Sequence, residues 1–191
     1  MNKARFLFGI FIAITIVYSF FHSGENLVRY FSYFTTISNL FMSIFYIYLG
    51  VFRLSIIKHT VSLIRSAILG YLVISSLVYI FILHSPDSSY WVIILFHKIN
   101  PIIFFVDWLF CRNEPKINFR EITYWFIFPF AYVIYVLFLG NAINWYPYNF
   151  FNLQLVGSKS FVINFLLILF VSIIISVVIV KLGNFRKKLF L

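Results

Sequence analysis

Charged residues are scarce in this chain, and acidic residues are the scarcest of all. Only 10% of the 191 residues are charged, with 5 acidic side chains against 15 basic ones. An ordinary soluble domain carries about 25% charged residues, so the composition excludes one. The single cysteine, Cys111, excludes an intrachain disulfide. The composition therefore rules out both a soluble globular domain and a disulfide-stabilised scaffold.

Several chemical signatures are also missing from the sequence. It contains no HxxxH, HExxH or CxxC motif, so we expect no metal ion and no cofactor. It has no glycine-rich phosphate loop and no GxSxG elbow. The net charge of +10 comes from basic residues that lie mostly between apolar stretches, not along one exposed face. We therefore expect no nucleic-acid partner.

Hydrophobic residues make up 63% of the chain and gather in six long stretches. A helix needs about 20 residues to cross about 30 Å of hydrocarbon. The first stretch ends without a small-x-small cleavage site, so it is predicted to be an uncleaved anchor. The sequence predicts an all-α polytopic membrane protein, a single domain over residues 1–191 with one bundle of six transmembrane helices. The predicted spans are residues 6–21, 33–52, 66–83, 90–110, 122–140 and 161–182.

Basic residues are unevenly divided between the two sides that these spans define. Arg29 and Lys159 lie on one side, and Lys98 lies inside the fourth span. Connections on the cytoplasmic side of a membrane carry an excess of Lys and Arg, so both termini are predicted to be cytoplasmic. The other side holds Lys3, Arg5, Arg53, Lys58, Arg65, Arg112, Lys116, Arg120, Lys181, Arg186, Lys187 and Lys188.

A short polar run interrupts the fourth span. Ionisable side chains are costly in a bilayer and usually mark a functional site. Pro101 lacks an N–H group and clashes with the carbonyl of His97, four residues earlier, so the helix is predicted to kink there. Irregular backbone at membrane depth is tolerated where it lines a cavity, and a simple packing kink is the alternative. The run consists of His97, Lys98, Asn100 and Pro101, followed by Asp107 and Trp108.

Hydroxyl and amide side chains form a stripe at the start of the second span. Thr35 and Asn39 are four residues apart and share a helix face, and Thr36 lies beside them. Such residues often do no more than hydrogen-bond membrane helices together, which is the alternative interpretation. His97 lies six residues, or about 9 Å, inward from Trp91 near the outer end of the fourth span. Thr35 lies six residues, again about 9 Å, past Arg29, the last charged residue on the outer side, so Thr35 and His97 are predicted to reach matching depths.

A threonine and a histidine inside an apolar bundle can support acyl transfer. The imidazole activates the hydroxyl as a nucleophile. Asn39, Tyr146 or Tyr148 can donate hydrogen bonds to the developing oxyanion, and Asn100 is a further candidate contact to the substrate. Asp107 is about 15 Å along the helix from His97, so we expect it to pair with a basic residue instead.

The longest connection, residues 141–160, carries a run of aromatic residues around Trp145 and Pro147. Aromatic rings are typical of the membrane interface, so this run is predicted to anchor there or to fold back as a lid over a cavity. His22, His59 and His84 lie in connections and are expected to be solvated.

Three stretches of the sequence resemble the motifs of a known family, the bacterial six-span "Pr-six-Pr" membrane proteins. That family is in turn similar to the eukaryotic androgen-induced membrane proteins, which hydrolyse fatty acid esters of hydroxy fatty acids with a threonine and a histidine. The stretches are Tyr33-Phe34-Thr35-x-x-Ser38-Asn39-Leu40, His97-x-x-x-Pro101-x5-Asp107-Trp108 and Trp145-Tyr146-Pro147-Tyr148-x-Phe150.

The resemblance implies that Thr35 is the nucleophile, because it follows a Tyr-x-Thr pattern. It implies that His97 is the base, because His97 lies ten residues before an acidic residue. The spacing to Asn39 is one residue longer than in the family if Thr35 is the match, so Thr36 is a rival. The acidic residue is Asp107 here and not glutamate. The resemblance also implies a bacterial cytoplasmic membrane.

Two functions follow from these observations. The first is an intramembrane hydrolase of lipid or fatty-acid esters, with Thr35 as nucleophile and His97 as base. The second is a non-enzymatic membrane protein that binds or transports a lipid or small solute, with a polar relay through Lys98, Asn100 and Asp107. Either function places a membrane lipid or a similar small molecule among the partners, and the oligomeric state is left open.

Overall fold

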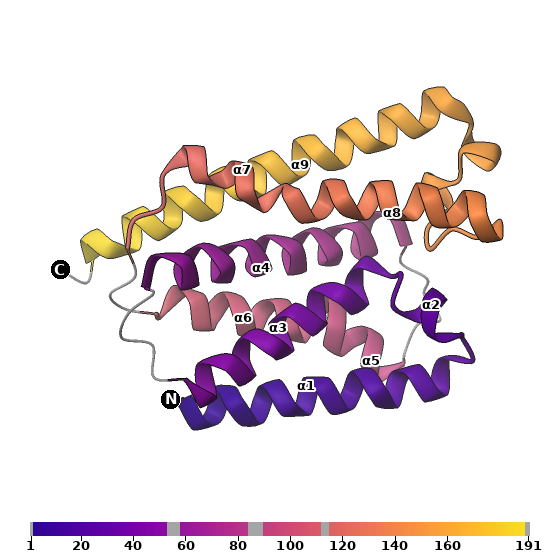
Figure 1. Ribbon diagram of the computed structural model, residues 1–191. Coiled ribbons are helices and arrows are strands. Elements are labelled where there is room, and N and C mark those ends of the chain that lie inside the picture. The colour runs from indigo at the N-terminus through magenta and orange to yellow at the C-terminus, as the bar shows by residue number, and fades with distance from the viewer. Residues whose placement is uncertain (1, 53–57, 84–89, 112–114, 190–191) are drawn as a thin grey trace.

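Helices make up most of the structure, and the residues that it describes include no strand (Figure 1). The computed structural model describes residues 2–52, 58–83, 90–111 and 115–189, so Arg53, His84 and Arg112 lie outside the described residues. In this part of the chain six helical stretches are long and apolar enough to cross a membrane, which confirms the predicted all-α fold. The helical elements are α1 (Asn2–Ser23), α2 (Leu27–Tyr30), α3 (Phe34–Val51), α4 (Lys58–Val78), η1 (Tyr79–Leu83), α5 (Trp91–Ile94), η2 (Leu95–Ile99), α6 (Asn100–Leu109), η3 (Phe119–Glu121), α7 (Ile122–Trp125), α8 (Ile127–Ile143), η4 (Asn149–Phe151) and α9 (Leu153–Leu189).

The long helical stretches run alternately up and down along one bundle (Figure 1). The start of α1 and the end of α9 lie at the same end of the bundle, which we call the proximal end. The opposite, distal end carries α2 and η4. Helix α4 lies inside the bundle and contacts α3, α6 and α9. The side of the membrane that each end faces remains the prediction drawn from the basic residues.

Four of the spans are longer than the sequence predicted, the third and the sixth by the most. The third was predicted over residues 66–83, but α4 begins at Lys58 and continues as η1 to Leu83. The sixth was predicted over residues 161–182, but α9 runs from Leu153 to Leu189 with a break at Gly157, whose φ is +73°. Hydropathy marks the part of a helix that suits hydrocarbon, whereas the backbone stays helical through the polar turns that follow.

Small residues bring α1 and α3 into close contact. A Cβ atom on Gly9 would lie 2.9 Å from the carbonyl oxygen of Ser43, and one on Gly50 would clash with Phe6. The Ser43 hydroxyl also donates a hydrogen bond of 2.7 Å to the Gly9 carbonyl. Lipid tails are as apolar as the helices, so close packing and interhelical hydrogen bonds of this kind hold a membrane bundle together.

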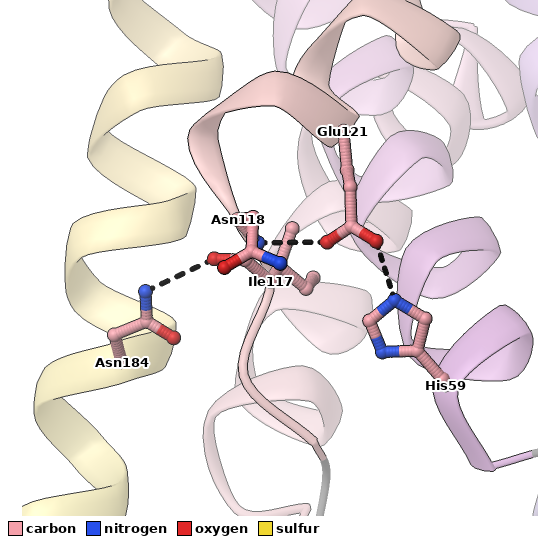
Figure 2. Close-up of polar contacts among 5 residues, drawn as sticks. All are labelled: His59, Ile117, Asn118, Glu121 and Asn184. Carbon is pink, nitrogen blue, oxygen red and sulfur yellow. Dashed lines mark hydrogen bonds and ion pairs between the residues drawn. The ribbon is translucent and has the colours of Figure 1, made fainter.

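Polar contacts at the proximal end join three separate parts of the chain (Figure 2). The Nε2 atom of His59 lies 2.6 Å from the Glu121 carboxylate, whose other oxygen accepts a 2.7 Å hydrogen bond from the Asn118 N–H group. Asn184 of α9 donates to the carbonyl of Ile117 at 3.2 Å. The expectation that His59 is simply solvated was wrong, because it fixes the start of α4 to η3. The sequence showed no sign of this partner, which is 62 residues away.

Candidate active site

Thr35 and His97 meet at the distal end of the bundle. The Oγ1 atom of Thr35 lies 3.0 Å from the Nε2 atom of His97, a hydrogen-bonding distance between side chains 62 residues apart in the chain. Thr35 belongs to the first turn of α3, and His97 is in the middle of η2. The structure therefore brings together the two residues that the sequence predicted to lie at matching depth.

The helix around His97 is irregular, as the sequence predicted from Pro101. Residues Leu95–Ile99 form a π-helical segment, in which the N–H group of Asn100 bonds to the carbonyl of Leu95. Pro101 follows in the first turn of α6, where a missing N–H group is tolerated. The ribbon changes direction between α5 and α6 (Figure 1). Single π-helical turns are frequent at functional sites, and here the turn carries His97.

The hydrogen bonds of His97 define which ring nitrogen carries the proton. Its Nδ1 atom lies 3.0 Å from the backbone carbonyl of Ile93. A carbonyl oxygen can only accept, so Nδ1 is the protonated nitrogen of the neutral ring and Nε2 is bare. The bare Nε2 atom faces the Thr35 hydroxyl, which donates to it. This is the arrangement that a histidine needs in order to remove a proton from a hydroxyl.

Two residues of the third span complete the surroundings of the pair, and the sequence analysis missed both. The Ser75 hydroxyl lies 2.8 Å from the Thr35 hydroxyl. Because the Thr35 proton points to His97, Ser75 donates and Thr35 accepts. The ring of Tyr79 stacks on the imidazole, with centroids 4.2 Å apart. Ser75 and Tyr79 are four residues apart, so both reach the pair from one face of the third span.

Two cavities of different chemistry adjoin Thr35. The larger has a volume of about 300 Å³, and many of its lining residues carry hydroxyl groups. The smaller has a volume of about 60 Å³ and is lined mostly by aliphatic and aromatic side chains. Thr35 and Tyr148 line both cavities, whereas His97 lines the larger one. The polar residues of the larger cavity are Ser19, Tyr30, Tyr33, Thr35, Thr36, Tyr79, Tyr90, His97 and Tyr148.

Tyr148 comes from the aromatic run that the sequence predicted to be an interface anchor or a lid. It is buried, and the turn η4 that follows it buries Phe151 as well. Its hydroxyl accepts a 3.1 Å hydrogen bond from the N–H group of Phe34, one of the free donors at the start of α3. Burial raises the pKa of Tyr148 to about 12, so the phenol keeps its proton at neutral pH.

Asn39 and Asn100 are joined to each other beneath the pair. The Nδ2 atom of Asn100 donates to the Oδ1 atom of Asn39 at 2.7 Å, and both side chains are fully buried. The Nδ2 atom of Asn39 donates to the Thr35 carbonyl at 2.9 Å and to the Phe96 carbonyl at 3.4 Å. These bonds fix α3 against η2 and α6, and the NH2 group of Asn39 already donates to two backbone carbonyls.

The other predicted residues lie around this centre or away from it. Thr36 and Pro147 line the larger cavity. The ring of Tyr146 covers Gly140, and a Cβ atom there would clash with it. Trp145 lies under the guanidinium of Arg29, which is 5.3 Å from the ring centroid.

The second polar part of the fourth span lies at the proximal end. Asp107 accepts hydrogen bonds from Arg5 of α1 at 2.8 and 2.9 Å, so it pairs with a basic residue there. The indole of Trp108 donates to Ser66 of α4 at 3.1 Å. Lys98 is exposed on the surface of the bundle. The three members of the suggested relay, Lys98, Asn100 and Asp107, therefore have separate surroundings.

Comparisons of the chain with protein-family models, with curated proteins and with solved structures gave no match.

Proposed function

We propose that this protein is an intramembrane hydrolase of lipid or fatty-acid esters, with Thr35 as the nucleophile and His97 as the general base. The observation that carries the proposal is the 3.0 Å contact between the Thr35 hydroxyl and the bare Nε2 atom of His97. The resemblance to the "Pr-six-Pr" family supports the same assignment. It also favours the bacterial cytoplasmic membrane as the location.

The first half of the reaction transfers the acyl group to the protein. The Thr35 oxygen attacks the ester carbonyl carbon while its proton moves to Nε2 of His97. The tetrahedral intermediate collapses when His97 returns that proton to the alkoxy oxygen, and the alcohol leaves. The product of this half-reaction is an acyl ester on Thr35. The Ile93 carbonyl stabilises the transient imidazolium through its bond to Nδ1.

The second half of the reaction needs water beside His97. The cavity of about 300 Å³ beside His97 has room for several water molecules. His97 removes a proton from one water as it attacks the acyl-threonine, and then returns that proton to Thr35. The fatty acid leaves, and the sum of both halves is ester plus water giving acid plus alcohol.

Tyr148 is the best candidate to stabilise the oxyanion. Its hydroxyl keeps its proton, lines both cavities beside Thr35 and is fixed by the Phe34 N–H group. Donors aimed at the developing charge usually supply the largest single part of catalysis. Asn39 is the weaker candidate, because its amide already donates to two backbone carbonyls.

The test is ester turnover by the purified protein in lipid nanodiscs. A panel of fluorogenic and branched fatty-acid esters would be offered to the wild type, Thr35→Ala, His97→Ala and Thr36→Ala. We expect turnover by the wild type and by Thr36→Ala, and its loss in the other two variants at unchanged melting temperature. Turnover that survives without His97, or no turnover of any ester by the wild type, would move the assignment to a non-enzymatic lipid-binding or transport protein.

A further inference from the structure

The two cavities at Thr35 are divided by the nucleophile itself. Thr35 and Tyr148 line both of them. His97 lines the larger one, which we call the tyrosine-rich cavity, and Ser75 lines the smaller, apolar one. A carbonyl carbon attacked by Thr35 therefore has two different spaces beside it. The acyl half of a fatty-acid ester needs apolar surroundings, whereas the alcohol half can be bulky or polar. The difference between the two cavities therefore determines how the ester is oriented at Thr35.

Residues of α4, α8 and α9 line the apolar cavity, which is the first of two neighbouring cavities that we together call the apolar crevice. A second apolar cavity of about 40 Å³ shares several lining residues with it and continues outward past Phe130 and Phe165. The side chain of Phe130 is 45% exposed on the surface of the bundle. Apolar side chains of the two cavities thus extend from Thr35 to the exposed ring of Phe130. The shared residues are Pro129, Val133, Phe151, Ile168 and Ser172.

We infer that the acyl chain of the substrate lies in this crevice between α4, α8 and α9, and that the alcohol half lies in the tyrosine-rich cavity. The inference rests on the proposed function, because it orients an ester at Thr35. The crevice then binds a single hydrocarbon chain.

The position of His97 provides the main argument. In both half-reactions the substrate atom that exchanges a proton with Nε2 is the alcohol oxygen or the water oxygen that replaces it, and its partner on the protein is the Thr35 oxygen. That oxygen must lie on the His97 side of Thr35, which is the side of the larger cavity. The acyl chain, on the opposite side of the carbonyl carbon, is then directed into the apolar crevice.

The shapes of the two spaces agree with this orientation. The crevice is the smaller of the two spaces beside Thr35 and its lining is mostly apolar, so an unbranched hydrocarbon chain leaves few polar groups there without a partner. The other cavity, of about 300 Å³, accommodates a bulky or branched alcohol, and its hydroxyl groups can hydrogen-bond a polar one. We therefore expect strong selection for acyl chain shape and weak selection for alcohol shape.

The first experiment fills the crevice. Val133→Phe would be compared with the wild type on nitrophenyl acetate, butyrate, octanoate and palmitate in nanodiscs. We expect kcat/KM for the long acyl chains to fall by about tenfold or more, with the acetate nearly unchanged. Ile134→Phe is the matched control, since Ile134 is the next residue on α8 and is 69% exposed to the surroundings of the bundle.

The second experiment needs no variant, so a folding defect cannot obscure it. A long-chain fatty acid with a terminal diazirine, which mimics the acid product, would be photolysed with the wild type and the adducts mapped. Adducts on α8 and α9 near Phe130, Phe165 or Leu169 would support the inference. Adducts on α1 or near Tyr90 would overturn it, because they would place the chain in the larger cavity.

The outcomes separate the inference from the function on which it rests. The orientation is wrong if the wild type hydrolyses the esters and neither Val133→Phe nor Ile134→Phe changes the dependence of turnover on acyl-chain length. The assignment as a hydrolase would then stand. Absence of turnover by the wild type would overturn both. Loss of the long-chain esters alone, together with adducts on α8 and α9, would establish the orientation.

Discussion

Two polar pairs occupy the two ends of the same helical stretch, and they differ in almost every respect. At the distal end, the neutral side chains of His97 and Thr35 share one hydrogen bond and face two cavities. At the proximal end, Asp107 receives two hydrogen bonds from Arg5 and lines neither of those cavities. In this bundle the polar pair that has space beside it is the candidate reaction site. Where the partner is a full opposite charge, the pair instead joins helices.

The largest effect on turnover is expected from the distal pair itself. Thr35→Ala and His97→Ala should each lower kcat by about a thousandfold, because each removes the activated nucleophile. The double variant should lose no more than either single one, because nucleophile and base act as a unit. Single-turnover kinetics on one fluorogenic ester would measure all three variants.

Additive losses in the double variant would contradict a joint role. Thr36→Ala is the control, because Thr36 lines the same cavity next in the chain.

Tyr148→Phe is expected to have the next largest effect. It removes the hydroxyl that can donate to the oxyanion, so kcat should fall by about a hundredfold while KM changes little. Steady-state kinetics across the ester panel would separate the two parameters. Tyr146→Phe is the matched control, since its ring packs on Gly140. An equal loss in both variants would mean that the aromatic run acts only through packing.

The pH dependence gives a second measurement on Tyr148. A phenol donates only while it is protonated, that is, below its pKa, and burial raises that pKa to about 12. Turnover limited by this proton should therefore not decline as the pH rises through about 10, the usual tyrosine value. It should fall only on approach to pH 12. A decline centred on the usual value would show that the donor is a more exposed tyrosine.

Ser75→Ala is expected to have a smaller effect, of about fivefold in kcat. It removes the hydroxyl that donates to Thr35, and a net hydrogen bond is worth about 1 kcal/mol. Ser76→Ala is the control, because Ser76 bonds to the carbonyl of Leu72 within its own helix. The profile of kcat against pH would distinguish a contact to the nucleophile from a packing defect.

The sequence predicted the six helices because hydropathy reports directly on the lipid environment. It predicted that Thr35 and His97 reach one depth because helix rise is constant. It could not predict Ser75 or Tyr79, because their role depends on the rotation of α4 about its axis. Helix rotation follows from the packing of side chains across several helices, and no local pattern in the sequence carries it. The partner of His59 was missed for the same reason.

The smallest effect on turnover is expected from the proximal pair. Asp107→Leu leaves the guanidinium of Arg5, whose side chain is 10% exposed, without its carboxylate. It should lower the free energy of unfolding by about 2 kcal/mol or more, because a buried charge that loses its partner is costly. The protein that remains folded should retain the kcat of the wild type.

Replacing both partners, Arg5→Leu with Asp107→Leu, should recover most of the lost stability, because two leucines pack where the two charges were. Thermal unfolding in nanodiscs, with turnover measured on the same samples, would test both statements. A fall in kcat that persists in the stable double variant would contradict the division between the two ends. It would give Asp107 a part in function that acts at a distance from His97, as the relay interpretation requires.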